Sequence, residues 1–166
     1  MTQPNIASPR RTATLEIGGQ DVVLAYADER AEYEALRRGA IVVDRSHRGR
    51  LRVFGEKSGE ALTGLVTNDV LAMQPGQGRY AAALSSKGRI VADVRIFAGV
   101  ASYLVDTSAR AWPGLLGMVK KYVNPRVSGY RDDSHAIRDL GVFGVEARSI
   151  VSAMTPRRLC CSQLGR

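Results

Sequence analysis

The segment from Tyr80 to Phe97 constrains the fold most strongly, because two β-type runs flank one short turn. The runs are YAAAL and RIVADVRIF, and the turn between them is SSKG. Alternation with a period of two is typical of a strand that is buried on one face. In the second run the alternation places Ile90, Ala92, Val94 and Ile96 on one face, and Arg89, Val91, Asp93, Arg95 and Phe97 on the other. We therefore expect a hairpin with one apolar face and with the carboxylate of Asp93 on the opposite face.

The rest of the chain adds short β-type runs and a few helical patterns. Strands are predicted over 13–17, 20–26, 41–44, 50–55, 100–106, 126–132 and 135–143, with a hairpin turn at Gly18 and Gly19. Helices are predicted over 29–39, with Asp28 as its cap and Ala31, Ala35 and Leu36 as its apolar side, over 56–69 and over 108–122. Most links between these segments have the length of a hairpin connection. This order predicts an α+β fold with antiparallel sheets and packed helices.

Three regions follow from the same patterns. Residues 1–11 have no periodic pattern and are expected to form a loose leader. Residues 12–154 are expected to form one domain, with 50–133 as its most complete part. After a helix-like segment over 146–154, the sequence TPRRLCCSQLGR loses all periodicity. We therefore expect residues 155–166 to be a disordered or aberrant tail.

Charge and hydropathy exclude some classes of function. No apolar run approaches the roughly 20 residues that cross a bilayer, and MTQPNIASPRR lacks the apolar stretch of a secretory signal. The net charge is +8, but five of the 24 basic residues lie in the first eleven or last ten positions. In the remainder, 19 basic residues accompany 16 acidic ones. We therefore expect neither a membrane protein nor a nucleic-acid-binding protein.

The cysteines and histidines do not form a metal-binding pattern. Cys160 and Cys161 are adjacent, a spacing that strains a disulfide, and His47 and His135 are far apart in sequence. We expect no metal site. Reduced cysteines fit a cytoplasmic location, or the mitochondrial matrix if the source is eukaryotic.

A basic cluster begins directly after the predicted strand at 41–44 and extends into the predicted strand at 50–55. Its members are Arg45, His47, Arg48, Arg50 and Arg52. The pattern leaves three interpretations open: a solvated turn and strand edge, a phosphate-binding patch, or a rim that attracts a polyanionic ligand tail. We favour the structural turn.

Five separated blocks carry a family resemblance. They are EYEALRRGAIVVDRSHRGRLRVFG, LVTNDV, GRYAAALSSKGRIVADVRIF, YLVDTSAR and DLGVFGVEAR. In order and spacing they resemble the N-terminal portion of the glycine cleavage T-protein, a tetrahydrofolate-dependent aminomethyltransferase, from about Glu32 to Arg148. The resemblance stops before the family's second half, which supplies the rest of the folate pocket. We therefore expect the chain to be a fragment of such a protein.

The resemblance implies a role for four residues. Asp93 falls on the catalytic acid of a G-x-I-x-D-D-L block, whose first Asp is replaced here by Ala92. Tyr80 falls on a tyrosine along the pterin pocket, and Phe97 replaces a second family tyrosine. Asp106 stands where the family usually has an asparagine, so its contact with the pterin ring is altered. The resemblance thus implies a folate-binding site formed by Tyr80, Phe97 and Asp106, with Asp93 as the catalytic group.

The implied chemistry needs an acid at this place. A secondary amine of tetrahydrofolate must lose a proton as it attacks a one-carbon unit, and a carboxylate in a poorly hydrated pocket can accept that proton. In the family the donor is an aminomethyl group on a lipoyl-bearing carrier protein. From the strand pattern alone, Asp93 is instead a surface carboxylate paired with Arg89 or Arg95.

Three functions therefore remain open. The chain is a tetrahydrofolate-dependent aminomethyltransferase, or a non-catalytic folate-binding protein related to the branch that maintains iron–sulfur clusters, or a truncated product that acts only as an interaction fragment.

Overall fold

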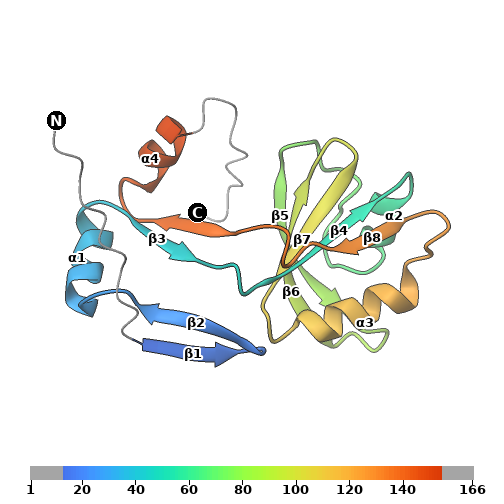
Figure 1. Ribbon diagram of the computed structural model, residues 1–166. Coiled ribbons are helices and arrows are strands. Elements are labelled where there is room, and N and C mark those ends of the chain that lie inside the picture. Colours follow the sequence, from blue (N-terminus) through green and yellow to red (C-terminus); the bar gives the residue numbers. More distant parts are fainter. Residues whose placement is uncertain (1–12, 155–166) are drawn as a thin grey trace.

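The computed structural model describes residues 13–154, and it confirms the α+β fold with antiparallel sheets (Figure 1). The elements follow one another as β1 (Ala13–Ile17), β2 (Gln20–Ala25), α1 (Glu29–Arg38), β3 (Ile41–Asp44), β4 (Gly49–Phe54), α2 (Ser58–Thr63), β5 (Gly78–Leu84), β6 (Ile90–Ala98), β7 (Ser102–Thr107), α3 (Trp112–Tyr122), β8 (Gly129–Asp132), β9 (Leu140–Phe143) and α4 (Ala147–Met154). The expected loose leader at 1–11 and aberrant tail at 155–166 lie outside the described residues.

A five-stranded antiparallel sheet forms the main body, in the order β5-β6-β7-β4-β8. The predicted hairpin is its first pair of strands, with Tyr80 opposite Arg95 and Ala82 opposite Asp93. β6 then pairs with β7, and β7 pairs with β4. Because side chains alternate across a strand, this register fixes which residues of all five strands share a face.

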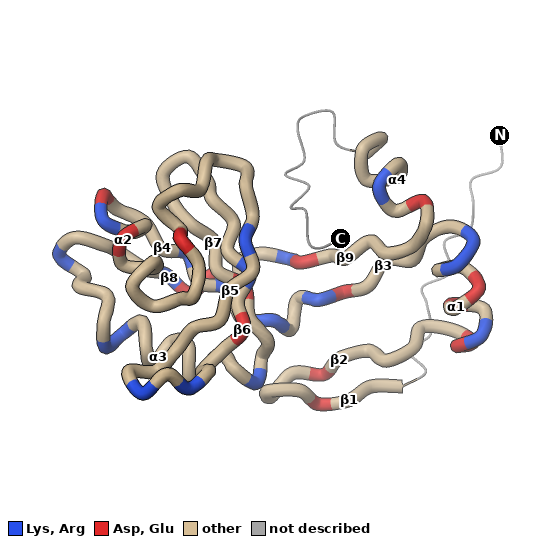
Figure 2. The backbone as a smooth tube through the Cα atoms, turned by 180° about the vertical axis from the view of Figure 1, so that it is seen from behind, with Lys and Arg blue, Asp and Glu red and all other residues tan. Residues whose placement is uncertain are grey.

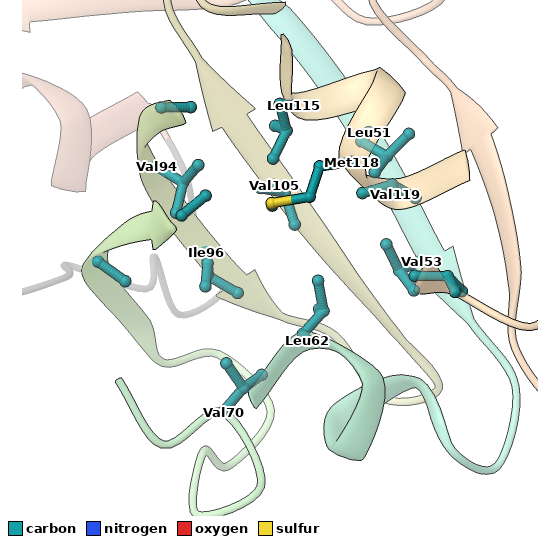
Figure 3. Packing of buried hydrophobic residues seen from close by; sticks show 14 of the residues in the cluster. Leu51, Val53, Leu62, Val70, Val94, Ile96, Val105, Leu115, Met118 and Val119 are labelled. Atoms are coloured by element: carbon teal, nitrogen blue, oxygen red, sulfur yellow. The ribbon is translucent and has the colours of Figure 1, made fainter. Parts of the chain in front are cut away.

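One face of this sheet carries the hydrophobic core. Ala92, Val94 and Ile96 of β6 are buried there, as the alternation predicts, whereas Ile90 at the end of the strand is 72% exposed. Figure 3 shows Leu115, Met118 and Val119 of α3 against this face, with Leu62 of α2 and Val70 completing the cluster. The opposite face of the sheet holds Asp93 and its neighbours. We call it the open face.

Two smaller sheets lie beside this body (Figure 1). β1 and β2 form the predicted hairpin, in which Gly18 and Gly19 have the positive φ angles of 62° and 78° that a two-residue hairpin turn requires. β3 pairs with β9, so residues 41–44 contact residues 140–143. Helix α1 begins after Asp28, whose side chain accepts a hydrogen bond from Ala31 N, and ends at Gly39 as predicted.

Some predicted elements are shorter or face solvent. The helix predicted over 56–69 ends at Thr63, because residues 64–67 instead pair along the edge of β5: Thr67 N donates to Ala82 O, and Leu84 N donates to Leu65 O. The strand predicted over 135–143 is reduced to β9, because Ala136 and Ile137 turn back onto Asp133 O. In α1, Ala31 and Ala35 are exposed, so the predicted apolar side of that helix is not a buried face.

Within residues 13–154, every helix is too short or too polar to span a lipid bilayer.

Candidate functional site

The register of the five-stranded sheet sets four polar residues side by side on the open face. Tyr80 of β5 lies opposite Arg95 of β6, Arg95 lies opposite Asp106 of β7, and Asp106 lies opposite Arg50 of β4. Asp93 lies two residues along β6 from Arg95 and therefore on the same face. The strands thus bring the predicted residues Tyr80, Asp93 and Asp106 together, although they are up to 26 positions apart in the sequence.

Tyr80 and Asp93 form a direct pair. The Tyr80 hydroxyl donates a hydrogen bond of 2.9 Å to Asp93 Oδ2, and this bond raises the pKa of Tyr80 above its ordinary value. The Tyr80 side chain is 53% exposed and Asp93 is also exposed. The expectation of a poorly hydrated pocket around this carboxylate is therefore wrong for the residues described here. Among them Asp93 forms no ion pair, so the alternative pairing with Arg89 or Arg95 is also wrong.

Asp106 is the partner of Arg95 instead. Its carboxylate is 4% exposed and accepts 2.9 Å hydrogen bonds from Arg48 Nε at both oxygens, while Arg95 Nε lies 3.1 Å from Oδ2. Two guanidinium groups therefore surround one buried carboxylate. The negative charge of Asp106 is thus balanced within the chain, so it is not free to repel a ligand.

Phe97 and Asp106 line a pocket of about 250 Å³ on the open face. Its walls come from β4, β6, β7 and the segment before β9, and consist of Arg50, Arg95, Phe97, Leu104, Asp106, Ile137, Arg138 and Asp139. Asp93 is not one of these residues, but its neighbour Arg95 is. Arg95 is the cross-strand partner of Tyr80 and lies two residues from Asp93 on β6, so the pocket lies next to the Tyr80–Asp93 pair. Burial raises the pKa of Asp139, which lies in the wall of this pocket, and the negative charge of Asp106 is the second cause of the increase.

The basic cluster is not a solvated patch. Three of its arginines have a carboxylate partner: Arg45 with Asp139 at 3.9 Å, Arg48 with Asp106 at 2.9 Å and Arg52 with Asp133 at 2.6 Å. Arg50 is 2% exposed, and its Nη2 atom donates to Ser46 O and Ser134 O at 2.7 Å each. Figure 2 accordingly shows acidic and basic segments interspersed where β3 and β9 approach the sheet.

The two histidines lie at a separate, polar pocket of about 400 Å³ that β2 and the segment before β9 help to line. Burial lowers the pKa of His47, and the positive charge of Arg48 is the second cause of the decrease. No group of three or more metal-ligating side chains occurs within residues 13–154. Cys160 and Cys161 lie outside the described residues.

The sequence interpretation did not identify Arg95 as part of this site, and it included Arg48 and Arg50 only in the open alternative of a rim for a polyanionic ligand tail. Arg48 and Asp106 are 58 positions apart, and no local pattern pairs residues from different strands. One signal was present: Arg48, directly before β4, and Arg50 within it alternate with Arg52, so all three were candidates for one face.

Comparison with known proteins finds one family model and several aminomethyltransferases that are similar to this chain. The family model described as the GCVT N-terminal domain matches residues 12–164. The aminomethyltransferase of Bacillus subtilis is 32% identical over 143 residues, which are 86% of this chain and 39% of that protein. The aminomethyltransferase of Streptomyces coelicolor is 28% identical over 141 residues, or 84% of this chain and 38% of that protein.

A solved structure shares the fold. The crystal structure of the glycine cleavage system aminomethyltransferase T from Bartonella henselae superimposes with a TM-score of 0.72 and 19% identity, over 85% of this chain and 39% of that one. The chain therefore spans about 39% of the length of these proteins.

Proposed function

The chain belongs to the GCVT N-terminal domain family, and on that premise we propose that it is the folate-binding portion of a tetrahydrofolate-dependent aminomethyltransferase. In this proposal Asp93 is the catalytic residue, and Tyr80, Phe97 and Asp106 contact the reduced folate. The donor of the one-carbon unit is an aminomethyl group on a lipoyl-bearing carrier protein.

The observation that carries the proposal is the Tyr80–Asp93 pair beside the Phe97 pocket. The hydrogen bond between the two side chains holds Asp93 Oδ2 in place and leaves Oδ1 free to accept from a ligand. A flat ring that lies against Phe97 would extend along the open face towards that oxygen. The pair stands on paired strands, and so do five of the eight residues that line the pocket. Strands position side chains more rigidly than loops do.

The proposed chemistry uses Asp93 as a proton acceptor. When a secondary amine of tetrahydrofolate attacks the aminomethyl carbon, the bond from that carbon to the lipoyl sulfur breaks and the sulfur leaves as a thiolate. The attacking nitrogen becomes positively charged and must release its proton. A carboxylate within hydrogen-bonding distance stabilises that charge and takes the proton. Asp93 accepts the proton, while the Tyr80 hydroxyl donates a hydrogen bond to Asp93 Oδ2 and so positions the carboxylate. The same hydrogen bond raises the pKa of Tyr80 above its ordinary value.

The first test measures binding of tetrahydrofolate to the whole chain by calorimetry under reducing conditions. We expect weak binding, because Asp93 is exposed in the described part of the chain. Asp93→Asn should weaken this binding about tenfold or more, since it removes a hydrogen bond to a charged group. Tyr80→Phe should have a smaller effect, because the carboxylate remains.

The matched control is Asp21→Asn, which removes an exposed carboxylate from β2 and should leave folate binding unchanged. Equal affinities of the Asp93→Asn and wild-type chains would contradict the role of Asp93. Binding that depends on Asp93, without transfer from an aminomethylated lipoyl carrier, would instead indicate the non-catalytic folate-binding protein related to iron–sulfur maintenance.

A further inference from the structure

The surface around α3 is basic and has no acidic residue close to it in sequence. The two segments that form this surface, residues 70–92 and 107–131, contain no Asp or Glu. Figure 2 shows basic segments and no acidic ones along α3. We use the name basic face for the exposed cations in and beside α3 and in the turn before β6, which are Lys87, Arg89, Arg110, Lys120 and Lys121.

A β-bulge brings the start of β6 beside the start of α3. Val91 is the extra residue of this bulge, because the residues on either side of it pair with consecutive residues of β5. The Val91 side chain packs against the core, and a Cβ atom added at Gly114 of α3 would lie 3.0 Å from Val91 Cγ1. Arg89 and Arg110 therefore both lie near the start of the helix.

The end of α3 lies near the turn between β5 and β6. Tyr122 lines a pocket together with residues 85–86, which directly precede Lys87 in that turn. The ammonium group of Lys121 lies 5.1 Å from the centre of the Tyr122 ring. Glu60 is the acidic residue in the lining of this pocket and marks the edge of the basic face. The turn thus follows α3, and cations lie near both ends of the helix.

The charges of the basic face are not compensated by the described residues. None of the five cations forms an ion pair within residues 13–154, whereas Arg48 and Arg95 of the open face do. Lys120 and Lys121 lie in the last turn of α3, where the helix dipole stabilises a cation. The dipole does not account for the cations of the turn or for Arg110. Clustered like charges repel one another and attract an acidic partner.

Exposed apolar side chains lie among these charges. Ile90, next to Arg89, is 72% exposed, and Tyr122, next to Lys121, is 48% exposed. Interfaces between proteins combine apolar and charged contacts, whereas most contacts with nucleic acids go to phosphate and sugar. The composition of the basic face therefore favours an acidic protein as its partner over a nucleic acid.

We propose that the basic face binds an acidic protein segment, whose carboxylates pair with its five cations and whose apolar side chains contact Ile90 and Tyr122. Helix α3 covers the core side of the main sheet, so a partner bound there leaves the open face accessible (Figure 3). The inference goes beyond the proposed function and does not depend on it.

The test uses two synthetic peptides of equal length as probes, one composed of Glu and Leu and one composed of Gln and Leu. Fluorescence anisotropy measures the binding of each labelled peptide to the whole chain without folate. We expect saturable binding of the acidic peptide that weakens as NaCl is added, because salt screens exposed charges. The uncharged peptide should bind at least about tenfold more weakly. A single-stranded RNA with the net charge of the acidic peptide should also bind at least about tenfold more weakly.

Two double variants with the same change in net charge locate the binding. Lys120→Gln with Lys121→Gln removes two charges from the basic face and should weaken binding of the acidic peptide about tenfold or more. Arg30→Gln with Arg37→Gln removes two charges from exposed positions of α1 and should leave the affinity unchanged within about twofold. All four positions are exposed, so both double variants should keep the fold. Both also retain the basic residues outside 13–154, so any binding to those residues is the same in both.

The ¹H–¹⁵N spectrum of the whole labelled chain gives a second readout. The backbone amides of Gly88 and Gly117 should shift with the acidic peptide, and that of Val42 in β3 should not. Equal losses in the two double variants would show that net charge alone attracts the peptide, and RNA binding as tight as peptide binding would assign the face to nucleic acid. Either result overturns the proposal. Because folate is absent from every sample, failure here leaves the folate proposal standing, and failure of the Asp93 test leaves this one standing.

Discussion

At the scale of single residues, the open face is organised by charge pairs that cross several strands. The densest group is Asp106 with Arg48 and Arg95, in which two guanidinium groups contact one carboxylate that is almost fully buried. Removing one partner from a buried group of this kind is costly, because the remaining charges stay buried without compensation.

Asp106→Asn should therefore destabilise the chain by about 3 kcal/mol, even though the amide has nearly the same shape as the carboxylate. The matched control is Glu34→Gln, which breaks the exposed pair of Glu34 with Arg38 on α1 and should cost less than about 1 kcal/mol. Urea denaturation of both variants measures the difference. Equal losses would show that solvent screens the Asp106 group as well.

His47 gives a prediction for pH. Burial lowers its pKa in the folded chain, so the unfolded chain binds the proton more readily. The folded state is therefore penalised as the pH falls below about 6.5, the ordinary pKa of histidine. His47→Asn should remove this part of the pH dependence. The difference in unfolding free energy between wild type and His47→Asn should be constant above about pH 7.5 and should shift against the wild type on acidification.

The measurement is urea denaturation of both chains at several pH values between 5 and 8. The pKa of Asp133 is lowered and that of Asp139 is raised, but both residues are present in both chains, so the comparison isolates the change at position 47. A difference that does not vary with pH would contradict the assignment of a lowered pKa to His47.

The sequence could identify Tyr80, Asp93, Phe97 and Asp106 only through family resemblance. Alternation correctly placed Asp93 and Phe97 on one face of β6, because that rule acts within one strand. It could not reveal the hydrogen bond to Tyr80 or the ion pair of Arg95 with Asp106, because both depend on the register between strands. Their assignment as folate ligands stays a prediction.

At the scale of elements, the contact of α3 with β4 depends on one small residue. Gly49 begins β4, and a side-chain Cβ atom at this position would overlap the indole ring of Trp112 at the start of α3. Both residues are part of the packing between the helix and the sheet, so neither can move freely. Gly117 differs, because a Cβ atom there would meet nothing within 4 Å.

Gly49→Ala should therefore destabilise the chain by about 1–3 kcal/mol through overpacking. Gly117→Ala, in the exposed middle of α3, should stabilise it by roughly 0.5–1 kcal/mol, because alanine loses less backbone entropy in a helix. In thermal denaturation, the melting temperature should fall for Gly49→Ala and rise for Gly117→Ala. A rise in the melting temperature of Gly49→Ala would show that the indole ring repacks at little cost.

Local signals predicted elements well where a cap or turn residue specifies them. Asp28 and Gly39 mark the ends of α1, and Gly18 and Gly19 form the first hairpin turn. The prediction failed for residues 64–69, whose helical pattern continues past Thr63. There the unpaired edge of β5 competes for the same backbone groups, and Val66 pairs with Ala83 instead of extending the helix. No local pattern could indicate that competition.

At the scale of the whole molecule, the buried apolar residues are unevenly distributed. With the exception of Ala25, all those in the described part of the chain lie between Leu51 and Val123. The β3–β9 sheet exposes Val42 at 58% and Leu140 at 62% of their surfaces. A two-stranded sheet with few buried contacts is only weakly held in place, so it can open without global unfolding of the chain. The expectation that residues 50–133 form the most complete part of the domain can be tested on this basis.

Amide hydrogen exchange measured by mass spectrometry should separate the two parts. We expect peptides of β3 and β9 to exchange at least about a hundredfold faster than those of β6 and β7, because local opening costs less than global unfolding. Leu62→Ala, which removes a buried side chain from the main core, should cost about 2–5 kcal/mol and accelerate exchange in β6 and β7. Exchange in β3 and β9 should stay unchanged in this variant, since their opening does not require the core to unfold. Equal protection of both parts in the wild type, or equal acceleration of both by Leu62→Ala, would show instead that the small sheets and the core unfold as one cooperative unit.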